Sequence, residues 1–310
     1  MRHWKAATAG ALLLAGCSNA SVDQPTATKS VEASAEPQGD NILHITWGGI
    51  AEADQGEAKR HWSTWTINLV DGGPEYGWLS EKDAAFPHTL NFELAGTGKV
   101  RAVALDNRFA PVVREDGSMS QTAEGSPVRR FALFGSTVGP DGPFETLVTG
   151  EAKADARTLI KLPKEAPARW LRLRIDSNWK GGGATRLSDL AVYGELDQRG
   201  AAGEADVSGV YAHEYGPIAL RQSGQDIRGC YNNGLGTLRG TVFGRILRLA
   251  WFSKEEGSIG SATLVAANGK LYGFWYRPED KMGSPWNAVR KTSLTDADLG
   301  ACRAALYPPA

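Results

Sequence analysis

Four tryptophans stand in segments rich in turn residues, where an indole ring could face solvent: Trp62, Trp65, Trp78 and Trp179. The flat face of an exposed indole is a surface on which the C–H groups of a sugar ring can stack. Trp179 stands beside Lys180 and the flexible glycines at 181–183. We therefore expect Trp179 to be the most exposed of the four.

Polar side chains adjoin two of these tryptophans in the sequence. His61 precedes Trp62, and Lys180 follows Trp179. Either side chain could hydrogen-bond a ligand that is held against the neighbouring ring, although solvated loop charges are common on any protein surface. The candidate ligand-binding residues are therefore Trp179, Lys180, Trp62 and His61.

Catalytic motifs are missing from the sequence. The five histidines stand far apart, at positions 3, 44, 61, 88 and 213, and there is no GxSxG elbow, P-loop or HExxH pair. A pair of carboxylates across a cleft would leave no such motif, so an accessory enzyme remains a less favoured alternative. We expect a protein that is not an enzyme.

The first 17 residues have the pattern of a lipoprotein export signal. Arg2 and Lys5 precede an apolar run at 6–14 that is too short to span a bilayer, and Leu-Ala-Gly-Cys at 14–17 reads as a lipobox. This pattern predicts that Cys17 carries a lipid and anchors the chain in the cell envelope. In a Gram-negative host, Ser18 would direct it to the outer membrane, on the periplasmic or the outer face. The alternative is a plain secretory signal followed by a free thiol.

Composition divides the remaining chain into two domains. The net charge of −1 gives no argument for a nucleic-acid partner, and ten Trp with 37 Gly favour many short strands. Residues 18–40 are small and polar, which predicts a disordered tether, and 197–206 resemble a linker. The expected domains are therefore 41–196 and 207–310, both within the usual size range.

Alternating apolar residues and turn signals predict an all-β chain. In the first domain we expect strands at 89–94, 100–106, 129–136, 144–149, 158–162, 170–175 and 187–194, which suggest an antiparallel β-sandwich. In the second domain we expect strands at 209–211, 218–222, 227–231, 237–242, 247–252, 261–265, 271–276 and 287–290. Eight short strands joined by tight turns fit a small up-and-down β-barrel.

The first domain resembles a discoidin domain, the coagulation factor 5/8 type C family. The segments that carry this resemblance are NLVDG at 68–72, GWLS at 77–80, FPHTLNFEL at 86–94, FGST at 134–137, GPFETL at 142–147, ARWLRLRIDSNW at 168–179 and LAVYG at 190–194. They occur in the family's order over about half of the chain. The resemblance implies a galactose-binding-like jelly roll, a fold that serves sugar, lipid-head-group and protein binding alike.

The same resemblance implies a structural calcium ion. Many discoidin domains hold calcium where the Asp-Gly loop meets the last strand, through carboxylates and backbone carbonyls. The matching residues here are Asp71 and, more loosely, Asp189. The usual acid near the end is Glu, and the segment after Asp71-Gly72 departs from the family pattern. The alternative is that Asp71 makes an Asx turn. The family also places apolar residues where Trp65 and Trp78 stand, so we expect these two to close the end of the sandwich.

The second domain weakly resembles the calycins. Gly209-Val210-Tyr211 and Arg290 match a signature in which an aromatic residue near the start packs under an Arg near the end, with Tyr in place of the usual Trp. The resemblance implies a barrel that could hold a small ligand. Four aromatic residues of this domain could line a pocket or fill the core, and alternation favours the core: Trp251, Trp275, Tyr276 and Trp286.

The second domain also carries the two remaining cysteines. Cys230 and Cys302 lie 72 residues apart, and an oxidising compartment favours a structural disulfide between them. A reactive thiol pair is the alternative, but there is no CxxC spacing. Thr295 reads as the N-cap of a C-terminal helix that places Cys302 and Leu306 on one face.

These features together predict a lipid-anchored envelope protein that binds a glycan or another envelope polymer through its discoidin-like domain. The alternative is an interaction or inhibitor lipoprotein whose partner is an envelope protein. A less favoured third possibility is an accessory enzyme with its site in the barrel.

Overall fold

Antiparallel pairing of long, alternating strands builds the first half of the chain. The computed structural model describes residues 39–53, 62–108, 125–197, 206–213, 216–280, 283–291 and 302–306. The predicted lipidation site Cys17, most of the tether, His61 and most of the linker lie outside these residues. Of the tether, Asp40 is described, and it pairs with Gly194.

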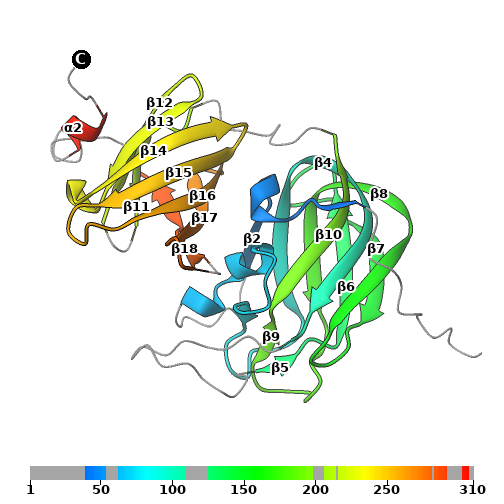
Figure 1. Cartoon of the computed structure of the whole chain (residues 1–310). Coiled ribbons are helices and arrows are strands. Elements are labelled where there is room, and N and C mark those ends of the chain that lie inside the picture. The colour runs from blue at the N-terminus through cyan, green and yellow to red at the C-terminus, as the bar shows by residue number, and fades with distance from the viewer. Residues whose placement is uncertain are drawn as a thin grey trace, which may run out of the picture. The chain divides into compact units, whose positions relative to one another are not determined.

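A seven-stranded sheet and a three-stranded sheet form the predicted β-sandwich (Figure 1). The larger sheet has the order β1-β10-β4-β8-β6-β7, with β2 paired to β4. Its strands are β1 (Asp40–Asn41), β2 (Ile50–Ala53), β4 (His88–Asp106), β6 (Arg130–Ser136), β7 (Glu145–Glu151), β8 (Arg157–Ile175) and β10 (Asp189–Leu196). The smaller sheet contains β3 (Trp78–Leu79), β9 (Thr185–Leu187) and β5 (Ser126–Pro127).

The two longest strands, β4 and β8, bend where their register shifts. The shifts fall between Glu93 and Gly98 and between Val100 and Ala102. Such bulges let one long strand change direction, so β4 pairs with β2 in its first part and with β10 in its second. The alternation predicted for 170–175 is confirmed, since Leu171, Leu173 and Ile175 are fully buried.

Three short 3-10 helices lie between β1 and β3: η1 (Ile45–Trp47), η2 (Trp62–Thr64) and η3 (Thr66–Val70). None of the helices in the described part of the chain is long and apolar enough to cross a bilayer.

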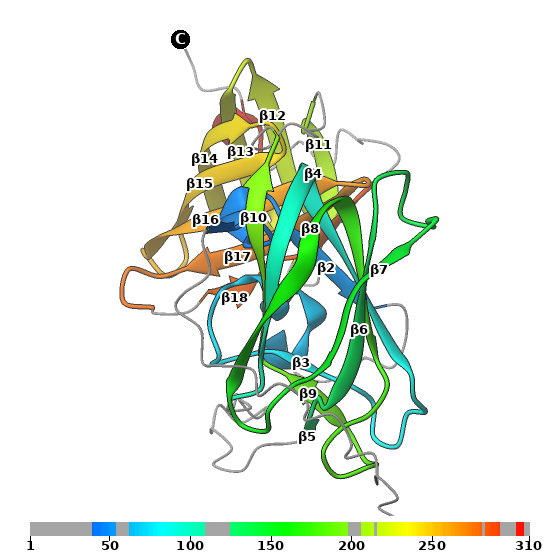
Figure 2. The same ribbon diagram turned by 90° about the vertical axis from the view of Figure 1, so that its right-hand side faces the viewer.

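Eight strands close into the predicted barrel, which Figure 2 shows from a second side. They are β11 (Gly209–Ala212), β12 (Ile218–Ser223), β13 (Asp226–Tyr231), β14 (Gly236–Phe243), β15 (Ile246–Ser253), β16 (Ile259–Ala267), β17 (Lys270–Tyr276) and β19 (Ala288–Arg290). Pairing of β16 with β17 completes the ring, and β18 (Ser284–Pro285) adds to β17. Asn268 and Gly269 have φ of 53° and 70°, as expected for a type I′ turn between β16 and β17.

The barrel shares buried residues with the sandwich. Val265, Tyr272 and Phe274 of β16 and β17 belong to the same buried cluster as the sandwich core. A second cluster fills the barrel itself and includes Tyr211, Leu249 and Trp251. The described residues of the sandwich and the barrel accordingly belong to one compact unit.

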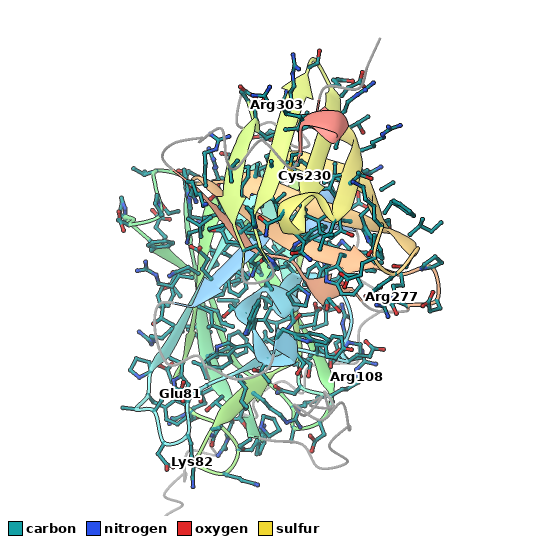
Figure 3. All side chains as sticks on the ribbon, turned by 90° about the vertical axis from the view of Figure 1, so that its left-hand side faces the viewer. Glu81, Lys82, Arg108, Cys230, Arg277 and Arg303 are labelled. Carbon is teal, nitrogen blue, oxygen red and sulfur yellow. A yellow bond between two sulfur atoms is a disulfide. The ribbon has the colours of Figure 1, made fainter. Side chains whose placement is uncertain are left out.

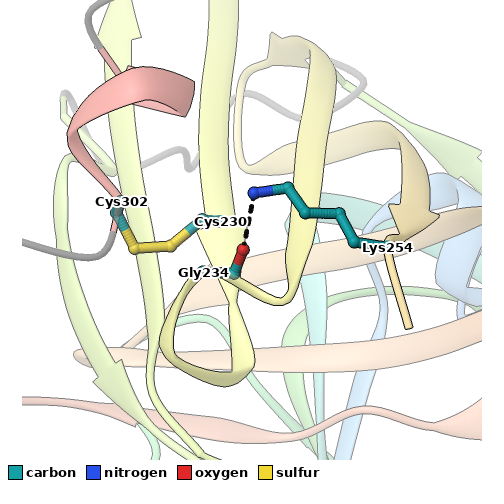
Figure 4. Close-up of a disulfide and its surroundings, with 4 residues drawn as sticks. All are labelled: Cys230, Gly234, Lys254 and Cys302. Atoms are coloured by element: carbon teal, nitrogen blue, oxygen red, sulfur yellow. Dashed lines mark hydrogen bonds between the residues drawn. A yellow bond between two sulfur atoms is a disulfide. The ribbon is translucent and has the colours of Figure 1, made fainter.

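A disulfide fastens the end of the chain to the barrel (Figure 4). Cys230 on β13 is bonded to Cys302, with 5.6 Å between their Cα atoms, and α2 (Arg303–Leu306) follows. Cys302 and Leu306 pack against Val210 and Ala219, so this end has a small apolar cluster of its own. The predicted disulfide is confirmed, whereas Thr295 lies outside the described residues.

Candidate functional site

The loop that presents Trp179 is held by the side chain of Asn178. This loop connects β8 to β9, and Asn178 is 2% exposed. Its Oδ1 accepts a hydrogen bond from the backbone N–H of Gly181 at 2.7 Å, and its Nδ2 donates to the Gly182 carbonyl at 3.1 Å and to Thr185 Oγ1 at 3.1 Å. Gly181 and Gly183 have φ of 77° and 72°, a conformation that favours glycine. The loop is therefore fixed in shape by one buried amide.

The Trp179 side chain is 40% exposed, as predicted. Its Nε1 donates to the Ala152 carbonyl at 3.0 Å, which fixes the position of the ring. The guanidinium carbon of Arg129 lies 4.7 Å from the ring centroid. A cation at this distance is attracted to the ring face, so Arg129 and Trp179 form one surface feature.

Charged groups surround this indole. Arg129 Nε lies 3.2 Å from Glu151 Oε2, with both side chains about half exposed. The Arg130 backbone N–H and its Nε both donate to Ser177 Oγ in the same loop. Lys180 is exposed, and its backbone N–H donates to Ser126 Oγ at 3.0 Å. The surface thus combines an indole face with charged donors and acceptors, which we call the Trp179 surface (Arg129, Glu151, Trp179 and Lys180).

Trp62, one of the other predicted ligand-binding residues, is not part of this surface. His61 lies outside the described residues. Trp62 is half-buried on η2 and meets Tyr76 edge to face, with 4.9 Å between the ring centroids. The η2 turn packs against β3 and β18, whereas Trp179 packs against residues next to β5 and β7. The two tryptophans therefore pack on different elements.

Trp65 and Trp78 are less available than Trp179. Trp78 is 1% exposed within the sandwich core, and half-buried Trp65 packs against the same core. This burial agrees with the expectation that both residues close the end of the sandwich.

The predicted metal ligands Asp71 and Asp189 approach the same short turn. Asp71 Oδ1 accepts from the Gly73 N–H at 2.9 Å, which is the Asx turn given as the alternative for this residue. Asp189 Oδ1 accepts from the Gly72 N–H at 3.3 Å. The structure therefore brings the two carboxylates to adjacent backbone groups, although they are 118 positions apart in the sequence.

Burial makes both carboxyl groups harder to ionise than a solvent-exposed aspartate. Burial, together with the charge of Asp189, raises the pKa of Asp71 well above its ordinary value. Burial, together with the charge of Asp106, raises the pKa of Asp189 to about 8. Among the described residues, the buried Asp71 Oδ2 has no hydrogen-bond partner. The negative charges of the two ionised carboxylates and the unpartnered oxygen of Asp71 fit a hard cation, which prefers oxygen ligands.

The number of acidic ligands is small for such a site. No group of three or more His, Cys, Asp or Glu side chains comes together as a metal site in the described part of the chain. Backbone carbonyls would therefore have to complete the coordination of a bound cation, as calcium allows.

In the barrel, the predicted contact between Tyr211 and Arg290 is present. Arg290 Nη2 donates to the Tyr211 hydroxyl at 2.9 Å, and its guanidinium carbon lies 5.3 Å from the ring centroid. Trp251 and Trp286 are 7% and 6% exposed, in agreement with the expected core positions. Their indoles also line a cavity, together with half-buried Trp275. The choice between core and pocket was therefore not exclusive.

Comparison with known proteins gives structural matches only. No family model matches the chain. No curated protein matches it either.

Several solved structures resemble about half of the chain. A family 32 carbohydrate-binding module of NanJ from C. perfringens, in complex with galactose, is 13% identical and covers 49% of this chain and 96% of its own, with a TM-score of 0.38. A Clostridium perfringens module in complex with GalNAc-β-1,3-galactose is 14% identical over 49% of this chain and 98% of its own, with a TM-score of 0.39. A third, from a family 31 glycoside hydrolase of Clostridium perfringens, is 15% identical over 52% and 100%, with a TM-score of 0.40. Likeness at this level says nothing about ligands of this chain.

Two residues of the Trp179 surface and its loop were missing from the predictions. Asn178 stands directly before Trp179 and close to three glycines, a pattern typical of a side chain that caps a turn. Arg129 gives no such signal, because its contact with Trp179 spans 50 positions and depends on strand pairing.

Proposed function

We propose that this chain is a non-enzymatic, lipid-anchored protein of the cell envelope that binds carbohydrate through the Trp179 surface. The observation that carries the proposal is an indole that is 40% exposed, fixed by a hydrogen bond to Ala152, and flanked by the Arg129–Glu151 ion pair. An indole face takes the C–H face of a sugar ring, while a guanidinium and a carboxylate bind hydroxyls at its edge. The lipid on Cys17 would hold this surface at the membrane.

The test is binding of the full chain, purified in detergent, to an array of glycans and peptidoglycan fragments. Trp179→Ala should weaken binding to the sugar class that the unchanged protein recognises by at least about tenfold. Phe252→Ala is a matched control, because Phe252 is an equally exposed aromatic residue at 40% but lies on the barrel strand β15. A blank array, together with specific capture of an envelope protein, would favour the alternative of a protein-interaction or inhibitor lipoprotein.

Asp71 and Asp189 would hold a structural calcium ion in this proposal. The support is the unpartnered, buried Asp71 Oδ2 beside a second buried carboxylate. A bound divalent cation would supply the charge that stabilises both ionised groups. It would order the turn at Gly72 and Gly73 without contacting the sugar.

A further inference from the structure

A cavity of ≈ 270 Å³ opens at one end of the barrel. Its lining residues lie where β13, β15 and β17 end, just after β11 and at the start of β12. Because consecutive strands of the barrel are antiparallel, the odd-numbered strands β11, β13, β15 and β17 all end on the same side. The topology therefore gathers residues from separate parts of the sequence around one opening.

Four aromatic side chains form the walls. Trp251 and Trp275 meet at 82° with 5.7 Å between ring centroids, and Tyr231 and Trp286 meet at 86° with 5.4 Å. The Trp251 indole is fixed by a hydrogen bond from Nε1 to the Ser261 carbonyl at 3.1 Å. Edge-to-face packing of this kind holds each ring in place, so the walls are formed before any ligand arrives.

Two glycines leave room for two of these rings to lie against the sheet. Gly236 faces Tyr231 across the sheet, and Gly260 faces Trp251. A Cβ at either glycine would overlap the ring of the facing residue, so each ring lies over a glycine backbone. Because these two rings lie over Gly236 and Gly260, they leave the space of the cavity open.

The rim of the cavity is polar. Arg277 Nη2 lies 3.3 Å from Glu256 Oε2, and its guanidinium carbon lies 5.7 Å from the Trp275 ring centroid. Ser258 Oγ donates to the same Glu256 oxygen at 3.0 Å. Figure 3 labels Arg277 beside the barrel strands, and its side chain is 44% exposed. His213 also lines the cavity, and burial lowers its pKa to about 4, so its ring is neutral at pH 7.

We infer that this cavity is a second carbohydrate-binding site, which takes one sugar ring of a glycan. The aromatic walls suit the C–H faces of a ring, and the Arg277–Glu256 pair suits its hydroxyls. A wholly apolar ligand would desolvate this pair without replacing its hydrogen bonds. Glu255 also lines the cavity and is a further acceptor for hydroxyl groups. The volume lies just below the ~300–1,000 Å³ typical of pockets for drug-sized ligands, so one ring fits better than a longer chain.

This inference rests on the substrate class of the proposed function but uses different residues. A chain with two sites would bind a polymeric glycan more tightly than a single sugar, because the second contact becomes intramolecular. The two sites can be removed one at a time, which separates their tests.

The test is isothermal titration of the full chain in detergent with methyl glycosides of hexoses and N-acetylhexosamines. Trp179→Ala removes the Trp179 surface and isolates the cavity. In this background, we expect saturable binding that Trp275→Ala weakens by about tenfold or more. Arg277→Met should weaken it similarly, and we expect it to leave the fold intact because nearly half of this side chain is exposed. Phe252→Ala in the same background should change nothing.

Three outcomes would overturn the inference: no glycoside binds the Trp179→Ala protein, Arg277→Met leaves its affinity unchanged, or cyclohexanol binds as tightly as the glycosides. Failure of the proposed function gives a different result, because Trp179→Ala would then leave glycan binding unchanged while Arg277→Met still weakened it.

Discussion

Arg245 Nη1 lies 2.7 Å from Glu93 Oε1, and the Arg245 side chain is fully buried. Arg245 stands in the turn between β14 and β15 of the barrel, and Glu93 lies on β4 of the sandwich. The Arg245 Nη2 group also donates to the Gly48 carbonyl at 2.5 Å. A charged hydrogen-bond network therefore lies among the apolar residues where the barrel contacts the sandwich.

Glu93→Gln should lower the free energy of unfolding by about 3–5 kcal/mol, because it leaves the buried Arg245 guanidinium without a counter-charge. Urea denaturation of the two proteins would measure this loss. Arg245→Met is the matched variant and should cost less, since Glu93 keeps Arg169 as a partner at 2.9 Å. Equal losses for the two variants would contradict this reading of the network.

Stability should depend on pH through Asp189. Its pKa is about 8 in the folded protein, against an ordinary value of 3.8 that applies to the unfolded chain, so the folded state binds the extra proton between these values. The contribution of Asp189 to the free energy of unfolding should therefore fall as pH rises from about 4 to about 8, against the opposite contribution of His213 below about pH 6.5. Thermal melts in a chelator across this range would measure the slope, and Asp189→Asn should flatten it. An unchanged slope in that variant would exclude Asp189 as the cause.

Calcium should restore the free energy of unfolding that is lost as the pH rises to about 8. At pH 8, a calcium concentration 100 times the Kd would add about 2.7 kcal/mol to the free energy of unfolding. The melting temperature should rise with calcium in the unchanged protein and stay constant in Asp71→Asn. A calcium response that survives Asp71→Asn would place the ion elsewhere.

Reduction of the disulfide should destabilise the chain. Cys230 and Cys302 close a loop of 72 residues, for which the chain-entropy model gives about 4 kcal/mol. Cys302→Ser should lower the midpoint of urea unfolding, and a reductant should then have no further effect. An unchanged midpoint would show that the loop around α2 adds little to stability.

Gly260→Ala should lower the free energy of unfolding, although alanine within a strand is ordinarily more stable than glycine. A Cβ there would overlap the Tyr276 carbonyl and the Trp251 indole, so we expect a loss of about 1–3 kcal/mol. Gly182→Ala is the control, because nothing lies within 4 Å of its added Cβ. Denaturation of both variants tests the argument, and equal stabilities would contradict it.

The sequence was most informative where short-range patterns determine structure. Alternating apolar residues located the longer strands of both halves, but not the short strands β1, β2, β3, β5 and β18. The continuity of β4 and β8 was not predicted, because pairing across a bulge depends on partners far away in the chain. In the same way, Trp179 could be selected from its glycine-rich loop, whereas its contact with Arg129 could not.

The burial predicted for the aromatic residues of the barrel did not decide whether they fill the core or line a cavity. A buried tryptophan can fill a core or line a cavity, and Trp251 does both. Trp251 can line the cavity because Gly260, which faces it across the sheet, leaves room for its indole. This pairing depends on the register of β15 against β16. The alternation of apolar residues does not determine that register to a single residue.

The most direct test is the glycan and peptidoglycan array with the unchanged chain, Trp179→Ala and Phe252→Ala. Carbohydrate binding through the Trp179 surface predicts that a defined sugar class binds, that Trp179→Ala weakens this binding at least about tenfold, and that Phe252→Ala does not. Binding that Trp179→Ala does not weaken, or an array that stays blank, would contradict it.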